Sequence, residues 1–222
     1  MFIVRHRKIF YYLSALITLI SIAAILFYGL SFGIDFRGGS LLEIEYQNTR
    51  PEIAALKAQL EQLSLGEYTA RPTGERGYIL RMREISQLEK QNVLQALSFS
   101  SESPFTETRF TAIGPVLGKE AEQKSIISII LVLVAIVLFI AFAFRKVSEP
   151  VSSWKYGAVA IVALLHDVIV PTGVFAVLGH LYGVEIDTLF VTALLVILGF
   201  SIHDTIVVFD RTRENLRLNK EK

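Results

Sequence analysis

Two His–Asp pairs lie inside long apolar stretches, and they are the residues best placed to do chemistry. His166 and Asp167 fall within "AIVALLHDVIV", and His203 and Asp204 fall within "GFSIHDTIVVFD". A charged carboxylate in hydrocarbon costs at least about 2.5–3.5 kcal/mol on insertion scales, so acids inside membrane helices usually mark ion or proton pathways. Because removal from water disfavours the charged form, protonation of such a carboxyl can fall in the physiological pH range. We therefore take Asp204, Asp167, His203 and His166 as proton-relay candidates.

The depths of the two acids in the membrane are expected to be similar. Asp204 lies seven residues before Arg211, about 10 Å below the water-facing edge, and Asp167 lies 12 residues after Lys155, about 18 Å in. Their two spans are antiparallel and joined by a short turn, so the spans are expected to pack together. Protonation of either acid would then bias the helix bundle between two packings.

Small residues near the acids fit a bundle that moves. Pro171 and Gly173 follow Asp167 and can break the hydrogen-bond ladder of the helix locally. Gly199 and Ser201 precede Asp204, and we expect them to allow close approach of another helix.

Four apolar runs are long enough to position these residues in a bilayer, which needs about 20 residues for each span. The first run follows basic residues as a signal peptide would, but its apolar part is too long and no small-residue cleavage site follows. Lys and Arg gather before the first span, between the second and third, and after the fourth, so both termini are expected in the cytoplasm. The expected spans are 9–30, 125–144, 156–178 and 188–209. The expected cytoplasmic segments are 1–8, 145–155 and 210–222, with a periplasmic turn at 179–187.

The segment 31–124 has the composition of a water-facing domain. Strand-like alternation and helical apolar periods follow one another in the order β-α-β-β-α-β, which favours a ferredoxin-like fold. Ser86 and Glu89 have the spacing of a capping box at the start of its second helix. The fold class is therefore an α-helical membrane protein with four transmembrane helices and an α+β ferredoxin-like periplasmic domain inserted between the first two. The domain contains no histidine and no recognisable catalytic set, so we expect it to bind or dock.

Glycines flank this domain on both sides. Gly38 and Gly39, in "GIDFRGGSLLEIEY", are typical of a tight turn, and Asp35 and Arg37 beside them suit an interface. Gly114, Pro115 and Gly118 lie at the other boundary, and the two joints permit the domain to tilt.

Asp210 and Arg211, in "FDRTREN", are read as the hydrated end of the fourth span. The chain has no cysteine, so disulfide and thiol chemistry are excluded.

Three long motifs resemble the SecD/SecF family of the resistance-nodulation-division superfamily, and within it the SecF subunits of bacterial protein export. "GIDFRGGSLLEIEY" is similar to the signature after the first span, and "HDVIV" and "GFSIHDTIVVFDRTREN" are similar to the SecF third and fourth spans. The resemblance implies a proton-gradient-dependent accessory subunit of the Sec translocon in the bacterial inner membrane, which promotes preprotein export with SecD and is not an enzyme. It implies SecD, SecYEG, a YajC-like accessory subunit and the preprotein in transit as partners, and protons as the coupling ion without a cofactor or metal.

The resemblance also implies residue roles and two departures from them. Asp204 corresponds to the proton-responsive acid of the fourth span, and Asp167 to a position of less certain role. The family usually has Asn where this chain has His203, so the titration of the site is expected to differ. A full SecF has six spans, and its fifth carries polar residues, including an Arg, that face the fourth-span acid. We therefore expect this chain to be a truncated fragment or one product of a split protein.

Three other functions are weighed against protein export. A proton-coupled small-molecule or lipid exporter of the same superfamily shares the buried acids but usually has larger outer domains. An intramembrane metallohydrolase would need His166, Asp167, His203 and Asp204 to converge, although adjacent side chains on a helix diverge by about 100°. A purely structural scaffold predicts that neutralising both acids preserves function.

Overall fold

A computed structural model describes residues 5–99, 103–143 and 153–220. The chain forms two compact units, one comprising Met1–Ser31 and Lys124–Lys222 and the other Phe32–Gln123. The helices are α2 (Arg7–Tyr28), α3 (Ile34–Arg37), α4 (Ile53–Glu61), α5 (Gln87–Leu97), α6 (Pro115–Ala143), α7 (Ser153–Tyr182) and α8 (Thr188–Lys220). The strands are β1 (Gly39–Tyr46), β2 (Thr69–Thr73), β3 (Gly77–Met82) and β4 (Phe105–Ile113).

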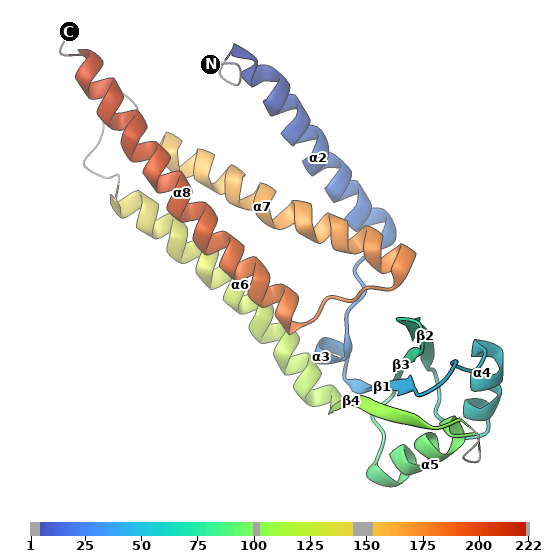
Figure 1. The fold of residues 1–222 in the computed structure, drawn as a ribbon. Helices are drawn as coiled ribbons and strands as arrows, with labels where there is room; N and C mark the ends of the chain where they lie inside the picture. The colour runs from blue at the N-terminus through green and yellow to red at the C-terminus, as the bar shows by residue number, and fades with distance from the viewer. Residues whose placement is uncertain (1–4, 100–102, 144–152, 221–222) are drawn as a thin grey trace. The chain divides into compact units, whose positions relative to one another are not determined.

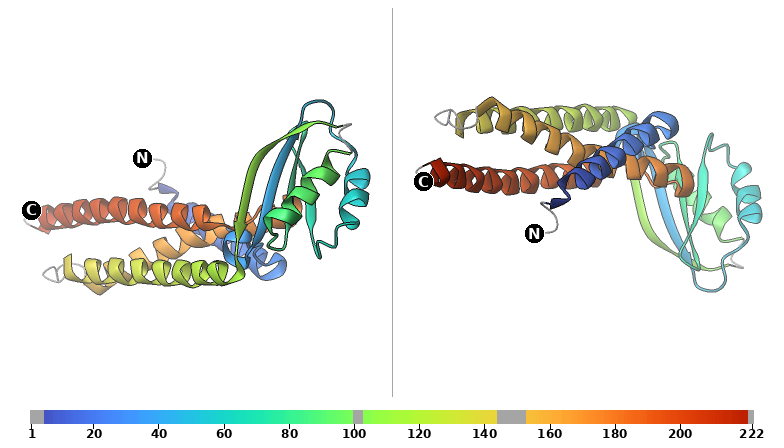
Figure 2. Two further views of the ribbon diagram at one scale, coloured as in Figure 1. Left: turned by 90° about the horizontal axis from the view of Figure 1, so that it is seen from below. Right: turned by 90° about the horizontal axis from the view of Figure 1, so that it is seen from above.

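Four of the described helices, α2, α6, α7 and α8, are long and apolar enough to cross a membrane. Within their unit α2 packs along α7, and α7 packs on α8 (Figure 1, Figure 2). A small apolar cluster joins the last part of α6 to α7 and α8 through Ile140, Ala160 and Phe209. The helices run past the apolar runs that mark the spans, because α-helix continues into polar sequence wherever no breaker intervenes.

The contact between α2 and α7 is very close at one point. Ser21 of α2 is buried, and a Cβ added to Gly173 of α7 would lie only 2.4 Å from the Ser21 Cβ and 2.5 Å from its Cα. The turn between α7 and α8 is tied to the end of α2, because the Ile186 N–H donates to the Ser31 carbonyl at 2.7 Å.

Helix α7 continues through Pro171, and the missing N–H of Pro171 breaks the hydrogen-bond ladder at that residue without ending the helix. The hydroxyl of Thr172 donates to the Val168 carbonyl at 2.6 Å, one turn back on the same helix. Gly173 serves the close approach of α2, which a longer side chain would prevent.

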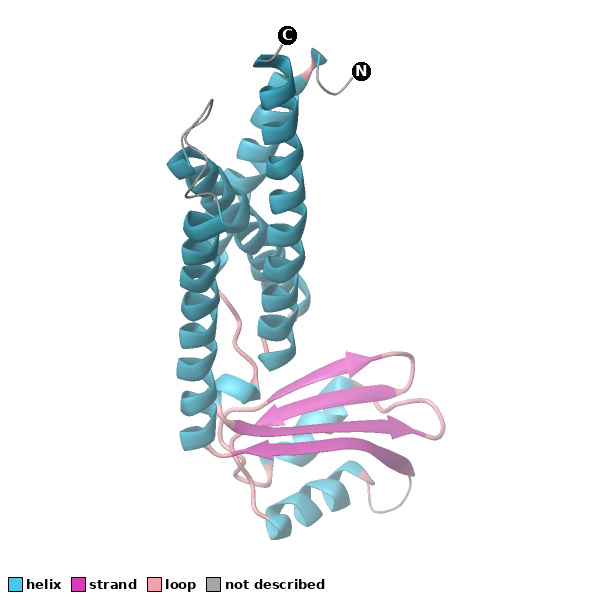
Figure 3. Ribbon diagram, turned by 90° about the vertical axis from the view of Figure 1, so that its left-hand side faces the viewer, coloured by secondary structure: helices cyan, strands magenta, loops and turns pink. Residues whose placement is uncertain are grey.

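The second unit is an antiparallel sheet with strand order β2-β3-β1-β4, and α4 and α5 lie against one face of it (Figure 3). Leu42 of β1 pairs with Leu80 of β3, and both side chains are fully buried. Helix α3 precedes β1 and was not expected, because its four residues are too few to give a helical period. The core residues are Leu42, Ile44, Tyr46, Leu56, Leu60, Leu65, Ala70, Tyr78, Leu80, Met82, Ile85, Val93 and Leu97.

One buried polar contact ties α5 to the sheet. The Tyr46 hydroxyl donates to the Leu97 carbonyl at 2.9 Å, at the last residue of α5. Burial raises the pKa of the Tyr46 phenol well above its usual range, so the phenol stays neutral and keeps its proton for this bond.

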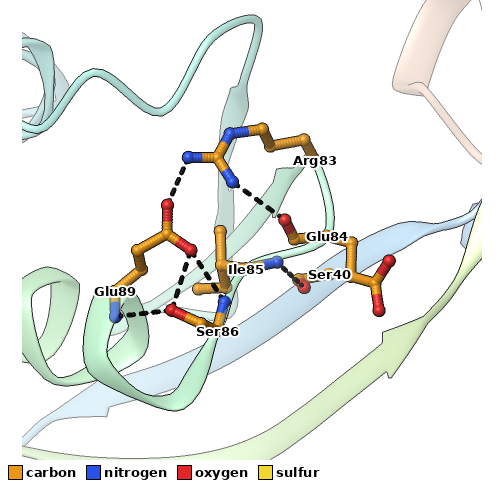
Figure 4. A network of polar contacts seen from close by, with 6 residues as sticks. All are labelled: Ser40, Arg83, Glu84, Ile85, Ser86 and Glu89. Atoms are coloured by element: carbon orange, nitrogen blue, oxygen red, sulfur yellow. Dashed lines mark hydrogen bonds and ion pairs between the residues drawn. The ribbon is translucent and has the colours of Figure 1, made fainter.

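The start of α5 is a capping box, as its sequence predicts. Ser86 Oγ accepts from the Glu89 N–H at 3.3 Å, and Glu89 Oε2 accepts from the Ser86 N–H at 2.8 Å. Arg83 adds an ion pair to the same Glu89 carboxylate, and the adjoining Ile85 N–H donates to Ser40 Oγ of β1 at 3.1 Å (Figure 4). The network joins the end of β3 to α5 and to β1.

The Glu89 network makes the stability of this unit depend on pH. The Arg83 guanidinium, and then the Ser86 N–H and hydroxyl, lower the pKa of Glu89 to about 2. Because the folded pKa lies below the unfolded value, this stabilisation is complete above about pH 4.5 and is lost as the pH falls toward 2. We expect Glu89→Gln to speed hydrogen exchange of the α5 amides at pH 6, and the difference from wild type to shrink at pH 3. A difference of equal size at both pH values would contradict this assignment.

The glycines at the edge of this unit pack tightly. Gly38 and Gly39 have φ values of +76° and +126°, which residues with side chains rarely adopt. A Cβ on Gly118, in the first turns of α6, would lie 2.7 Å from the Gly38 nitrogen and 3.0 Å from the Phe36 carbonyl oxygen. These glycines therefore let the chain before β1 approach the start of α6 closely.

Candidate functional site

Helices α7 and α8 meet along an antiparallel interface with aromatic contacts toward both ends. The Phe175 and Phe190 rings, near the turn, have centroids 4.3 Å apart, and the Tyr156 and Phe209 rings, far from the turn, have centroids 4.9 Å apart. Both helices are apolar over a length that allows packing of this kind over several turns. Asp167 and Ser201 lie between the two aromatic contacts.

Asp167 is the acid that this interface holds. Ser201 of α8 donates its hydroxyl to Asp167 Oδ2 at 2.5 Å, and His166 Nδ1 lies 3.1 Å from Asp167 Oδ1. The side chains of His166 and Asp167 are 34% and 30% exposed, so other parts of the protein cover most of the surface of each. A carboxyl bonded to a hydroxyl and an imidazole has partners that accept or supply a proton.

Backbone polarity adds to the side chains at this point of α7. Pro171 has no N–H, and it stands four residues after Asp167, where a helical residue donates to the Asp167 carbonyl. The backbone carbonyl of Asp167 therefore lacks its usual N–H donor, and the carboxyl of the same residue lies beside it. This part of α7 is the most polar part of an otherwise apolar span.

Asp204 and His203 are exposed on α8, and neither makes a side-chain hydrogen bond or ion pair within the described residues. The structure brings α7 and α8 together as expected, but it joins Asp167 to Ser201 and leaves Asp204 on an uncovered face. A Cβ on Gly199 would meet nothing within 4 Å, so none of the residues that the structure describes makes the close helix approach expected at Gly199.

Of the remaining predicted residues, two belong to the unit Phe32–Gln123 and two lie further along α8. Asp35 and Arg37 occupy the first and last turns of α3, where each charge suits the helix dipole. Asp210 and Arg211 lie within α8 and not at its end, and Arg211 Nη1 donates to Glu214 Oε2 at 2.6 Å. The candidate membrane span of α8 runs from Thr188 to Thr212, so Asp210 and Arg211 lie at the end of that span, although the helix itself continues to Lys220.

A metal centre is not supported by this geometry. Among residues 5–99, 103–143 and 153–220, no three His, Asp or Glu side chains lie close enough to hold a metal ion. The His–Asp pair of α7 and the exposed pair of α8 do not form one ligand set.

Ser201 makes a contact that the sequence did not predict. Its small size was taken as its role, whereas its hydroxyl is the direct partner of Asp167. The antiparallel register of the two spans could have indicated this pairing, because a short turn sets which residues of the two helices lie at the same depth. That register alone does not fix the rotation of each helix about its axis.

Comparison with known families identifies both motif regions. Residues 93–222 match the family described as protein export membrane protein SecD/SecF, C-terminal, and residues 23–49 match the SecD/SecF GG motif. The second match contains Asp35, Arg37, Gly38 and Gly39.

Named relatives are similar over nearly the whole chain. The chain is 44% identical to the protein translocase subunit SecF of Thermobaculum terrenum, over 96% of this chain and 69% of that protein. It is 33% identical to the SecF subunit of Anaerolinea thermophila, over 99% of this chain and 70% of that protein. The crystal structure of SecDF from Thermus thermophilus is 26% identical with a TM-score of 0.76, and it covers 92% of this chain and 27% of that one.

These matches confirm the relationship that the motifs predict. The chain spans about two thirds of the length of the SecF relatives and about a quarter of the SecDF chain. It is a membrane protein with four long apolar helices in its described part, and it belongs to the SecD/SecF family of protein export membrane proteins.

Proposed function

We propose that this protein is an accessory subunit of the Sec translocon that uses the proton gradient to promote export of preproteins across the bacterial inner membrane. It acts with SecD, and its further partners are SecYEG, a YajC-like subunit and the preprotein. Its relatives are named as protein translocase subunits, and a fused relative from Brucella abortus is named SecDF, which supports SecD as the partner. Protons are the coupling ion, and the protein catalyses no covalent step.

The observation that carries this proposal is an acid on each of two packed membrane helices. Asp167 of α7 is bonded to Ser201 of α8, and Asp204 lies one turn further along α8. Carboxyls inside a membrane bundle change charge when they bind a proton, and the change in charge alters which helix packing is most stable. A proton that crosses such a bundle therefore drives movement of its helices.

Asp204 requires a covering partner in the membrane. Its side chain is exposed on α8, and an ionised Asp facing lipid costs at least about 2.5–3.5 kcal/mol. We propose that further polar membrane helices, from the protein or from SecD, cover this face and supply a cation for the carboxylate. Asp204 then serves as the proton-responsive group, with His203, Asp167 and His166 as its relay.

The charges outside the spans support an orientation. Lys and Arg precede α2 and follow the apolar part of α8, whereas the α7–α8 turn contains none, which favours cytoplasmic termini. The unit Phe32–Gln123 then lies on the periplasmic side. Its strand order and two helices support a ferredoxin-like domain that docks on SecD.

Export across inverted membrane vesicles tests the proposed function. Vesicles that contain the protein and SecD are expected to complete preprotein export faster when a proton gradient is present, and a protonophore removes the gain. Vesicles that lack the protein provide the control, and they are expected to show little response to the protonophore beyond that of the translocon alone. If the protein leaves export unchanged but lowers the amount of a drug or lipid analogue in cells, it is instead a proton-coupled small-molecule or lipid exporter.

A further inference from the structure

The Asp167–Ser201 bond is a polar contact in an interface whose other described side-chain contacts are apolar. Leu164 on α7 and Leu194 and Leu198 on α8 are buried, and aromatic pairs lie on both sides of the bond. An ionised carboxylate among such groups is costly unless it is hydrogen-bonded. Ser201 supplies that hydrogen bond from the opposite helix.

A hydroxyl is suited to this task because it both donates and accepts. When Asp167 is ionised, Ser201 Oγ–H donates to the carboxylate across the contact between Ser201 Oγ and Asp167 Oδ2. When Asp167 takes up a proton on Oδ2, the carboxyl O–H donates to Ser201 Oγ, and the serine hydrogen turns to a carbonyl of its own helix. The two helices therefore stay bonded in both protonation states.

We propose that Ser201 is the positioning residue for Asp167, and that it lets this acid exchange its proton without parting α7 from α8. The proposal rests on the proton role of Asp167 given above, and it adds that the Ser201 hydroxyl keeps the interface between α7 and α8 closed. An alanine at position 201 would leave the interface closed only while Asp167 is protonated.

Few other titratable groups face this point. His166 lies beside Asp167 on α7, and His203 and Asp204 lie within one turn of Ser201 on α8 but are exposed. The packed helix α2 has no acidic or basic residue between Lys8 and Tyr28, only the phenols of Tyr11 and Tyr12. Helix α6 has no charged residue from Ser125 to its end. A pH effect that disappears with Asp167→Asn is therefore assigned to Asp167 itself.

The absence of cysteine from the chain allows a direct test. Tyr156→Cys with Phe209→Cys places a thiol pair at the aromatic contact far from the turn, and a short thiol cross-linker reports whether the helices are closed there. Phe175→Cys with Phe190→Cys is the matched control, because the short turn holds that end together. Cross-linking in native membranes is measured from pH 5 to pH 8.5, without an export assay.

The expected result is a cross-linked fraction that does not vary with pH when Ser201 is present. Ser201→Ala should lower cross-linking of the distal pair at high pH by on the order of tenfold, as expected for loss of a hydrogen bond to a charged group. Ser201→Thr should restore the wild-type behaviour, and adding Asp167→Asn to Ser201→Ala should abolish the pH dependence. Thr192→Ala removes an α8 hydroxyl that bonds only its own helix, and it should have no effect.

Two results would overturn the proposal. One is a Ser201→Ala variant that cross-links as wild type at every pH. The other is equal loss of cross-linking at all pH values, which would mean that Ser201 only fills space. Failure of the export proposal would leave this result intact, because the cross-link requires no translocation.

Discussion

Replacing Asp204 by Asn is expected to abolish the proton-driven part of preprotein export while leaving the protein folded and inserted. Asn has nearly the same size but cannot bind and release a proton. Asp204 makes no side-chain bond within the described residues, so the change removes no contact from the bundle. The export rate with a proton gradient should fall to the rate measured with a protonophore present.

Asp210→Asn is the matched control for this experiment. Asp210 is an exposed acid on the same helix, six residues nearer the C-terminus and beside Arg211. We expect its replacement to leave proton-driven export near the wild-type rate. Equal loss in both variants would show that α8 tolerates no loss of negative charge, and full activity of Asp204→Asn would remove Asp204 from the proton pathway.

Replacing Gly173 by Ala should destabilise the membrane bundle by about 1–3 kcal/mol, the usual cost of overpacking a well-packed site. The added Cβ would lie 2.4–2.8 Å from the Cβ, Cα and carbonyl oxygen of Ser21, so α2 and α7 must move apart. Unfolding of the purified protein in mild detergent, followed by circular dichroism, measures the change.

Two further substitutions test the cause of that destabilisation. Gly199→Ala places the same methyl group where nothing lies within 4 Å, and it should be neutral or slightly stabilising. Ser21→Gly added to Gly173→Ala removes the contact with the Ser21 Cβ but leaves those with its backbone, so it should restore stability only in part. A Gly173→Ala variant as stable as wild type would show that α2 and α7 pack differently.

Local patterns predicted much of this molecule. The apolar runs indicated α2, α6, α7 and α8, because a span is set by the length and hydropathy of a contiguous segment. The capping box at Ser86 was predicted because all of its partners lie within one turn of the chain. The motifs around Gly38 and Asp204 were sufficient to place the chain in its family.

Features that depend on helix rotation were not predictable. The sequence placed Asp167 and Asp204 at similar depth, but the side of α8 that faces α7 depends on packing along the entire interface. Gly173 was read as a helix breaker because its partner Ser21 is remote in sequence. The apolar run indicated that the fourth span ends near Asp210, but it gave no sign that α8 continues as a helix to Lys220.

Infrared difference spectroscopy on the protein reconstituted with SecD in lipid vesicles tests the central claim most directly. The protonation of membrane carboxyls is followed while a proton gradient is imposed and then collapsed. We expect a carboxyl signal that appears and disappears with the gradient, that is absent in Asp204→Asn and that persists in Asp210→Asn. Identical spectra for wild type and Asp204→Asn would contradict a proton-responsive role for this carboxyl.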